Sequence, residues 1–163
     1  MEKEGAPKVW IRWLAPEEIE RAADIAVAAW DPIYAGYREQ LGGELFDAFY
    51  SDWKEQKRRN TVSEIQGGNC LAADAEGVVI GFAVYTAEGR IGEIKGNAVA
   101  PEWRGRGIGT MLQKRVLDEM KRIGCRFAIV QTGLDEAHEP ARRIYQKNGF
   151  ESSLASVKYF QKL

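Results

Sequence analysis

The chain has 163 residues, a length that suits one domain with one substantial core, so we expect a single domain over residues 1–163. Its 45% hydrophobic and 29% charged residues are ordinary for a globular protein in water. The formal net charge of −1 gives no support for a nucleic-acid-binding surface, and no apolar run is long enough to cross a bilayer.

The cysteines and the single histidine bear on metal binding and on the redox state of the thiols. Cys70 and Cys125 are far apart and His138 is the only histidine, so the sequence has no zinc-type ligand spacing and we expect no metal site. Two cysteines in apolar surroundings are typical of reduced, buried thiols in a cytoplasmic protein. The charged N-terminus lacks the apolar stretch of a signal peptide, which also favours a cytoplasmic location.

The first half of the chain predicts one strand followed by helices. Residues Val9–Leu14 alternate weakly and predict a strand. Pro16 then opens a helix, which Asp31-Pro32 is expected to stop. The apolar face of this helix repeats at helical spacing through Ile19, Ala22, Ala23, Ala26, Val27 and Trp30. We expect a loop over Ile33–Gly43 and a second helical region over roughly Glu44–Gln66.

The second half alternates strands and helices. The predicted strands are Cys70–Ala73, Val78–Thr86, Ile91–Ala100, Arg126–Gln131 and Ser152–Gln161. A hairpin turn is expected at Asp74–Gly77, and helices over 108–123 and Glu139–Lys147. The strands on either side of helix 108–123 should be parallel, because a connection of that length calls for a right-handed βαβ unit. We therefore predict an α/β fold with a mixed, mostly antiparallel sheet, one parallel strand pair and helices on both faces.

A glycine-rich turn joins the strand that ends near Ala100 to the helix of residues 108–123. The first N–H groups of a helix lack intrahelical partners and carry the positive end of the helix dipole. Glycine lets a bulky anion approach this backbone without meeting a Cβ. These features predict a phosphate or pyrophosphate cradle. Its members are Arg104, Gly105, Arg106, Gly107, Ile108, Gly109 and Thr110.

The glycine spacing distinguishes this cradle from two well-known ones. A P-loop ends in Gly-Lys-Ser/Thr, and the dinucleotide fingerprint is Gly-x-Gly-x-x-Gly; neither fits. The order Arg104-x-x-Gly107-x-Gly109 is instead similar to the Arg/Gln-x-x-Gly-x-Gly/Ala signature of the GNAT family of acyl-CoA-dependent N-acyltransferases. The preceding strand end also resembles that family, which adds Asn97, Ala98 and Val99 to the implied cofactor contacts.

A second motif near the C-terminus carries the same resemblance. Ala141, Tyr145, Gly149 and Phe150 match the family pattern Asn-x-x-Ala-x-x-x-Tyr-x-x-x-Gly-Phe, whereas His138 stands where the family has asparagine. In relatives that asparagine often bonds the pantetheine arm or nearby backbone. His138 is therefore included as a cofactor contact, although a surface histidine at a helix start is the simpler interpretation.

The resemblance implies an N-acetyltransferase that moves an acetyl group from acetyl-CoA to a primary amine by direct attack in a ternary complex. It implies that Tyr145 lies near the CoA sulfur and protonates the departing thiolate, a role that competes with plain core packing. It also assigns stabilisation of the developing oxyanion to the backbone N–H near Val99. Glu93 is the candidate general base, because strand alternation places Glu93, Asn97 and Val99 on one face; an exposed glutamate paired with Lys95 or Arg90 is the alternative.

The acceptor site is expected around Trp30, Asp31, Tyr34 and Tyr37, where aromatic rings and a carboxylate suit a cationic amine. The alternative is a loop that packs its aromatics onto the core. A small-molecule or peptide amine fits equally well, and the family's frequent dimers allow a homodimer. Two other hypotheses remain: a non-catalytic acyl-CoA-binding module on the same fold, and a Rossmann-type nucleotide site, which conflicts with the glycine spacing.

Overall fold

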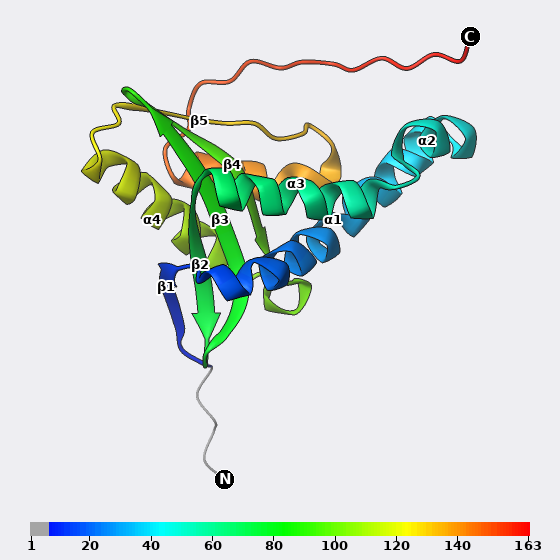
Figure 1. The fold of residues 1–163 in the computed structure, drawn as a ribbon. Helices are drawn as coiled ribbons and strands as arrows, with labels where there is room; N and C mark the ends of the chain where they lie inside the picture. Colours follow the sequence, from blue (N-terminus) through cyan, green and yellow to red (C-terminus); the bar gives the residue numbers. More distant parts are fainter. Residues whose placement is uncertain (1–6) are drawn as a thin grey trace.

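The computed structural model describes residues 7–163 and centres on a single five-stranded sheet (Figure 1). The strands lie in chain order: β1 (Val9–Trp13), β2 (Asn69–Ala75), β3 (Val78–Glu88), β4 (Ile91–Val99) and β5 (Phe127–Val130). Neighbours are antiparallel except β4 and β5, which are parallel. The predicted mixed sheet with one parallel pair is confirmed, as is the hairpin turn, where Glu76 and Gly77 have φ of 55° and 85°.

Helices cover both faces of this sheet, as predicted. They are α1 (Ile19–Leu41), α2 (Gly43–Tyr50), α3 (Trp53–Gly67), α4 (Ile108–Arg122) and α5 (Glu139–Lys147), with short 3-10 turns at Pro16–Glu18, Pro101–Trp103 and Glu136–His138. One core packs α4 against the sheet through Leu112, Val116 and Met120. The other packs α1 and α3 through residues such as Ile25 and Ile65.

The parallel pairing of β4 and β5 is short. It runs from Ile91 opposite Phe127 to Ile94 opposite Val130, and β4 then continues alone on this side to Val99. The last part of β4 is therefore paired only with β3, and its other edge is open where β5 has diverged. This open edge leads directly to the glycine-rich turn.

A bulge in β4 lies at the same point. Val84 of β3 pairs with Gly96 and Tyr85 pairs with Ile94, so Lys95 is an extra residue without an opposite partner. An extra residue shifts the strand register by one, and every side chain beyond it moves to the other face.

This bulge makes one sequence prediction wrong. Ile94 is buried in the core on the α4 side, and the Asn97 side chain donates a hydrogen bond to Tyr145 of α5 on that same side. Glu93 precedes Ile94 and faces the opposite side, that of α1 and α3. Glu93 and Asn97 therefore do not share a face, because simple alternation ignores the inserted residue.

The predicted helix stop at Asp31-Pro32 and the loop over Ile33–Gly43 are also wrong. Helix α1 continues through Pro32 to Leu41. Proline removes one backbone donor and costs about 3 kcal/mol inside a helix, so tertiary contacts must offset it. The ring of Tyr34 stacks on Trp53 of α3 with centroids 4.1 Å apart, which ties the second half of α1 to the fold.

Two further differences concern helix and strand boundaries. The predicted helical region of residues 44–66 is two helices, α2 and α3, interrupted at Ser51-Asp52. The predicted strand Ser152–Gln161 is absent from the described chain: residues 151–163 have no regular structure and run toward α2 (Figure 1). There, Phe160 packs its ring edge against Phe49 with centroids 5.1 Å apart. This aromatic contact replaces the ladder hydrogen bonds that the alternating pattern predicts.

Gly92 tests the packing of α4 on β4. A Cβ at this position would lie 2.5 Å from Sδ of Met120 and 2.8 Å from its Cγ. We expect Gly92→Ala to lower the free energy of unfolding in urea by about 1–3 kcal/mol, because the methionine must be displaced in a closely packed core. In a Met120→Ala background the same substitution should cost little. An equal penalty in both backgrounds would contradict this packing.

Candidate active site

The turn between β4 and α4 has the geometry of an anion-binding cradle. Gly105 and Gly107 have φ of 73° and 77°, in the left-handed region that glycine adopts at little cost. A Cβ on either glycine would meet no atom within 4 Å, so the backbone faces open space. Gly107 is the N-cap of α4 and offers no side chain to cap the helix.

The first turn of α4 has unpartnered donors. The first intrahelical bond to form at this end is from Met111 N–H to the Gly107 carbonyl, 3.0 Å. Within residues 7–163 the N–H groups of Ile108, Gly109 and Thr110 have no recorded acceptor, and the turn contains no acidic residue. Aligned free donors and the helix dipole together favour a bound anion. The Ile108 side chain is buried, so this residue offers only its backbone.

The side chains of the two arginines in the cradle contact different parts of the fold. Arg104 Nη2 donates 3.1 Å to the Ala29 carbonyl of α1. The neighbouring carbonyl, that of Ala28, lacks its usual helical donor, because residue 32 is proline. Arg106 lies over the Trp103 ring, 4.6 Å from its centroid. Arg106 also donates 3.3 Å to the Glu102 carbonyl, so both arginines flank the glycine turn and Arg104 links it to α1.

Gly109 has a different role from the other two glycines. Its Cβ would lie 2.7 Å from Cδ1 of Ile144 on α5. This close approach lets α4 pack on α5, which positions the second motif. The third glycine of the signature therefore serves helix packing.

Asn97 and Tyr145 join β4 to α5 beyond the point where β5 diverges. Asn97 Nδ2 donates a 3.0 Å hydrogen bond to the Tyr145 hydroxyl oxygen. Because the oxygen accepts this bond, the hydroxyl proton of Tyr145 remains available for another acceptor. Burial raises the pKa of Tyr145, an effect that the bond from Asn97 partly opposes, so the phenol is protonated at neutral pH. Its predicted role as an acid stays a prediction.

The backbone N–H of Val99 points toward the open edge of β4. Ala100 N–H donates 2.8 Å to the Ile80 carbonyl, which places the Ala100 N–H on the β3 side of the strand. Successive N–H groups alternate, so that of Val99 points to the open side. Ala98, whose side chain is buried in the α1-side core, offers only its backbone to a ligand.

Two carboxylates lie on the α1 and α3 side of β4. Glu93 forms a 3.0 Å ion pair with Lys95 and its side chain is 47% exposed, so its role as base stays a prediction. Glu64 of α3, which belongs to no motif in the sequence, is the second carboxylate. Its Oε2 lies only 2.6 Å from the position that a Gly96 Cβ would occupy, so only glycine leaves room for it. Burial raises the pKa of Glu64, and the charges of Lys57 and Lys95 oppose the shift.

His138 is buried, which makes the surface interpretation wrong. It lies at the start of α5, and its Nδ1 is 2.6 Å from Asp135 Oδ2. Its ring meets Trp30 of α1 edge-on, with centroids 5.4 Å apart. A three-residue spacing inside a 3-10 turn brings Asp135 and His138 together, a pattern that helix periodicity alone would not reveal.

The predicted acceptor residues divide into two groups. Trp30, Tyr34 and Tyr37 repeat at helical spacing on α1 and form one ring cluster. Asp31 lies on a neighbouring face of the helix, where it pairs with Lys54 at 3.2 Å and is largely exposed. Tyr37 also lines a hollow of about 690 Å³ between α1 and the turn before α5, together with Glu39, Gln40, Asp135 and Glu136.

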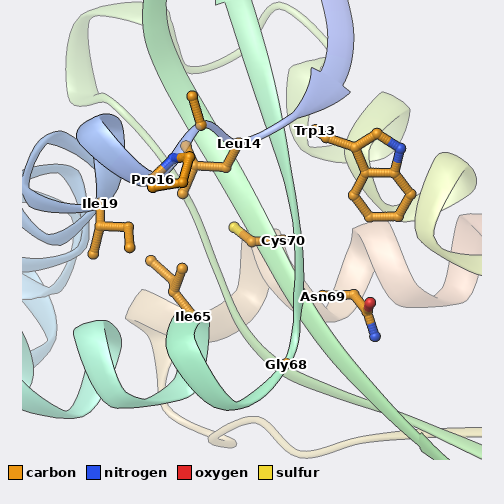
Figure 2. A pocket seen from close by; sticks show the side chains of 9 residues that line it. Trp13, Leu14, Pro16, Ile19, Ile65, Gly68, Asn69 and Cys70 are labelled. Atoms are coloured by element: carbon orange, nitrogen blue, oxygen red, sulfur yellow. The ribbon is translucent and has the colours of Figure 1, made fainter.

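A second, smaller hollow of about 270 Å³ lies near β1 and contains Cys70 (Figure 2). Figure 2 shows the Cys70 sulfur on the side of Leu14, Ile19 and Ile65. Burial raises the pKa of this thiol to about 12, so it is protonated and a poor nucleophile. Both cysteines are free and buried, as predicted. Among residues 7–163 no cluster of three metal-ligating side chains is placed to hold a metal ion.

The fold and the site define an α/β protein with an anion cradle at the end of a strand that has parted from its parallel neighbour. Comparison with known proteins agrees. The profile of the Acetyltransferase (GNAT) family matches residues 30–150. The chain belongs to this family.

The individual proteins that resemble this chain are 18–35% identical to it over the aligned residues. An IAA acetyltransferase of Azospirillum brasilense is 35% identical over 82 residues, which cover 49% of this chain and 52% of that protein. The chain thus spans about half the length of that curated relative. The structure of PaiA N-acetyltransferase from Thermoplasma acidophilum in complex with coenzyme A is similar with a TM-score of 0.63 and 25% identity, covering 91% of this chain and 93% of that one. An aminoglycoside N-acetyltransferase solved with CoA has a TM-score of 0.62 at 18% identity, covering 99% and 100%.

The raised pKa of Glu64 predicts a pH-dependent gain on its replacement. The unfolded chain loses this proton near pH 4.3, whereas the folded protein holds it to higher pH, so stability falls as pH rises through that interval. We expect Glu64→Gln to raise Tm relative to the natural protein at pH 7, with the difference disappearing below about pH 4. Thermal melts across pH check this, with exposed Glu55→Gln on the same helix as control. A lower Tm at pH 7 would show that Lys57 and Lys95 outweigh burial.

Proposed function

We propose that this chain is a one-domain N-acetyltransferase that transfers an acetyl group from acetyl-CoA to a primary amine. The observation that carries the proposal is the open edge of β4. The anion cradle lies at its far end, and the Tyr145 hydroxyl, fixed by Asn97, lies beside it. A diphosphate at the cradle and a thioester beside Tyr145 suit one extended ligand along this edge. Membership of an acetyltransferase family supports this ligand.

The residues present fit the phosphate end of coenzyme A. Free N–H groups and two left-handed glycines leave the cradle open to a bulky anion, and Arg104 and Arg106 supply positive charge at its rim. Pyrophosphate contacts of this kind come mainly from backbone donors, which hold charge without a matched side-chain geometry.

Acetyl-CoA supplies the activated acyl group and the thiol leaving group. The Val99 N–H points to the open edge, where it would stabilise negative charge on the carbonyl oxygen. Tyr145 would donate its hydroxyl proton to the departing sulfur. A covalent acyl-cysteine is not part of this proposal, because the Cys70 thiol is buried and protonated.

The acceptor enters, in this proposal, from the side of α1. The hollow beside Tyr37 carries the carboxylates of Glu39, Asp135 and Glu136, which suits a cationic amine. A small-molecule amine is the simplest occupant, and a homodimer and a cytoplasmic location are further parts of the proposal. Within the described residues no helix is both long and apolar enough to cross a membrane.

Gly107→Trp tests the cradle. The indole should occupy the open space in front of the helix N-terminus, so we expect calorimetric binding of acetyl-CoA to weaken at least 100-fold. Gly42→Trp is the matched control: Gly42 has φ of 76°, close to the 77° of Gly107, and also has no atom within 4 Å of its Cβ. Its ψ of 163°, against 4° for Gly107, lies in a region that is essentially restricted to glycine, so this variant carries at least as much backbone strain away from the cradle. Similar loss in both variants, or none in either, would contradict the assignment.

Tyr145→Phe tests the acid. Removing the hydroxyl should lower kcat for CoA release about 100-fold or more while leaving KM for acetyl-CoA within a few-fold, because a general acid acts in the transition state. Tyr85→Phe, another buried tyrosine, is the control with unchanged kcat. Tight acetyl-CoA binding by the natural protein without CoA release in the presence of spermidine, kanamycin or tryptamine would instead indicate a non-catalytic binding module.

A further inference from the structure

Asp135 and His138 form a geometrically complete acid–base pair. His138 Nδ1 is 2.6 Å from Asp135 Oδ2, and the His138 backbone N–H lies 3.2 Å from Oδ1 of the same carboxylate. An ionised carboxylate only accepts hydrogen bonds, so Nδ1 carries the proton and Nε2 presents a lone pair. In the described part of the chain no hydrogen bond to Nε2 is formed.

The surrounding loop is built to hold this pair. A Cβ at Gly133 would lie 2.5 Å from His138 Nδ1 and would also meet the Asp135 carboxylate, so only glycine leaves room for both. Arg142 of α5 braces the loop, because its Nη1 donates 2.7 Å to the Gly133 carbonyl and 2.8 Å to that of Asp135. The imidazole is buried and meets Trp30 edge-on, which fixes its orientation further.

The pair borders the acceptor hollow and lies at the start of the helix that carries Tyr145. His138 is the N-cap of α5 and Tyr145 lies in its last turn, so a spacing of seven residues, about two helical turns, places them on one face. Long helical side chains lean toward the N-terminus, which brings the Tyr145 ring toward His138. Asp135 lines the hollow that Tyr37 and Glu136 border. Ala137, the residue before His138, also lines this hollow, so an amine there lies next to the short turn that carries the pair.

We propose that His138, oriented by Asp135, is the general base that deprotonates the acceptor amine, an assignment that rests on the proposed function. The acceptor ammonium gives one proton to His138 Nε2, and the freed nitrogen forms a C–N bond with the acyl carbon as the C–S bond breaks. Tyr145 protonates the leaving sulfur and regains a proton from the acylated nitrogen. The imidazolium then releases its proton to solvent, so an amide, CoA thiol and one proton are produced.

The charges that face the imidazole explain why a histidine suits this position. The nearest carboxylate is that of Asp135, and the nearby cations are Arg142, bound to the loop carbonyls, and Lys57, whose Nζ lies 3.8 Å from the Trp30 ring. Tyr37 is neutral, because burial and the charge of Asp135 raise its pKa to about 12. Histidine is the side chain that exchanges a proton near neutral pH, as a base for an ammonium requires.

His138→Asn is the sharpest test, because asparagine is the residue that the family motif has at this position. It keeps a hydrogen-bonding side chain but removes the base. We expect kcat for CoA release to fall 10²–10⁴-fold, measured with the fastest of spermidine, kanamycin and tryptamine. KM for acetyl-CoA should stay within a few-fold, and the acidic limb of the kcat/KM profile should disappear. Asp135→Asn should lower kcat by a smaller factor, and Glu139→Gln, an exposed carboxylate in the first turn of α5, should change nothing.

The single histidine supplies an independent readout. In protein freed of any affinity tag, the imidazole C–H proton NMR signals belong to His138 alone. The pH at which these signals titrate should coincide with the acidic limb of the rate profile in the acetyl-CoA complex. A structural histidine would show no such coincidence.

The other outcomes are equally decisive. An active natural protein whose His138→Asn variant keeps its kcat and acidic limb overturns the assignment alone. Loss of that limb in Glu93→Gln, with His138→Asn unaffected, transfers the role to Glu93. No CoA release by the natural protein, despite acetyl-CoA binding, overturns the proposed function and this assignment with it.

Discussion

The architecture of the site depends on the separation of β4 from β5. Parallel pairing covers only four residues of each strand, ending at Ile94 and Val130, and the bulge at Lys95 begins where pairing ends. A bulge increases local twist and bends the strand. The bent strand keeps its β3 partner but leaves its other edge open, with a backbone N–H at Val99 that points outward. One inserted residue thus creates both the cleft and the reversal of side chains that places Asn97 against Tyr145.

Helix α1 forms the opposite boundary of this cleft because it does not stop at Pro32. The continuation carries Tyr34 and Tyr37 to the ring cluster with α2 and α3, while Trp30, just before Pro32, meets His138. Arg104 fixes this helix to the glycine turn through the Ala29 carbonyl. This hydrogen bond links the cradle directly to the helix that carries the acceptor side.

The elements that were predicted correctly from the sequence are those that short-range signals determine. Glycine spacing, cap residues and apolar periodicity are short-range signals, and they identified the βαβ unit, the hairpin and α5 with nearly correct bounds. The failures share a tertiary cause. Pro32 is overruled by aromatic stacking on Trp53, the bulge at Lys95 is set by pairing with β3, and residues 152–161 follow an aromatic contact with Phe49. Sequence periodicity contains no information about partners so distant in the chain.

The pair of Asp135 and His138 also depends on tertiary contacts, so it could not be detected from the sequence. His138 reads as a substituted motif residue at a helix start, and only the fold buries it against Trp30 and Asp135. Once it is buried, its relation to Tyr145 follows from helix geometry, because His138 is the N-cap of the helix that contains Tyr145. Glu93 and Glu64 belong to other elements, so their distance from Tyr145 changes whenever β4 or α3 shifts. A base and an acid on one helix keep their separation during such movements, which favours proton transfers that must occur in one ternary complex.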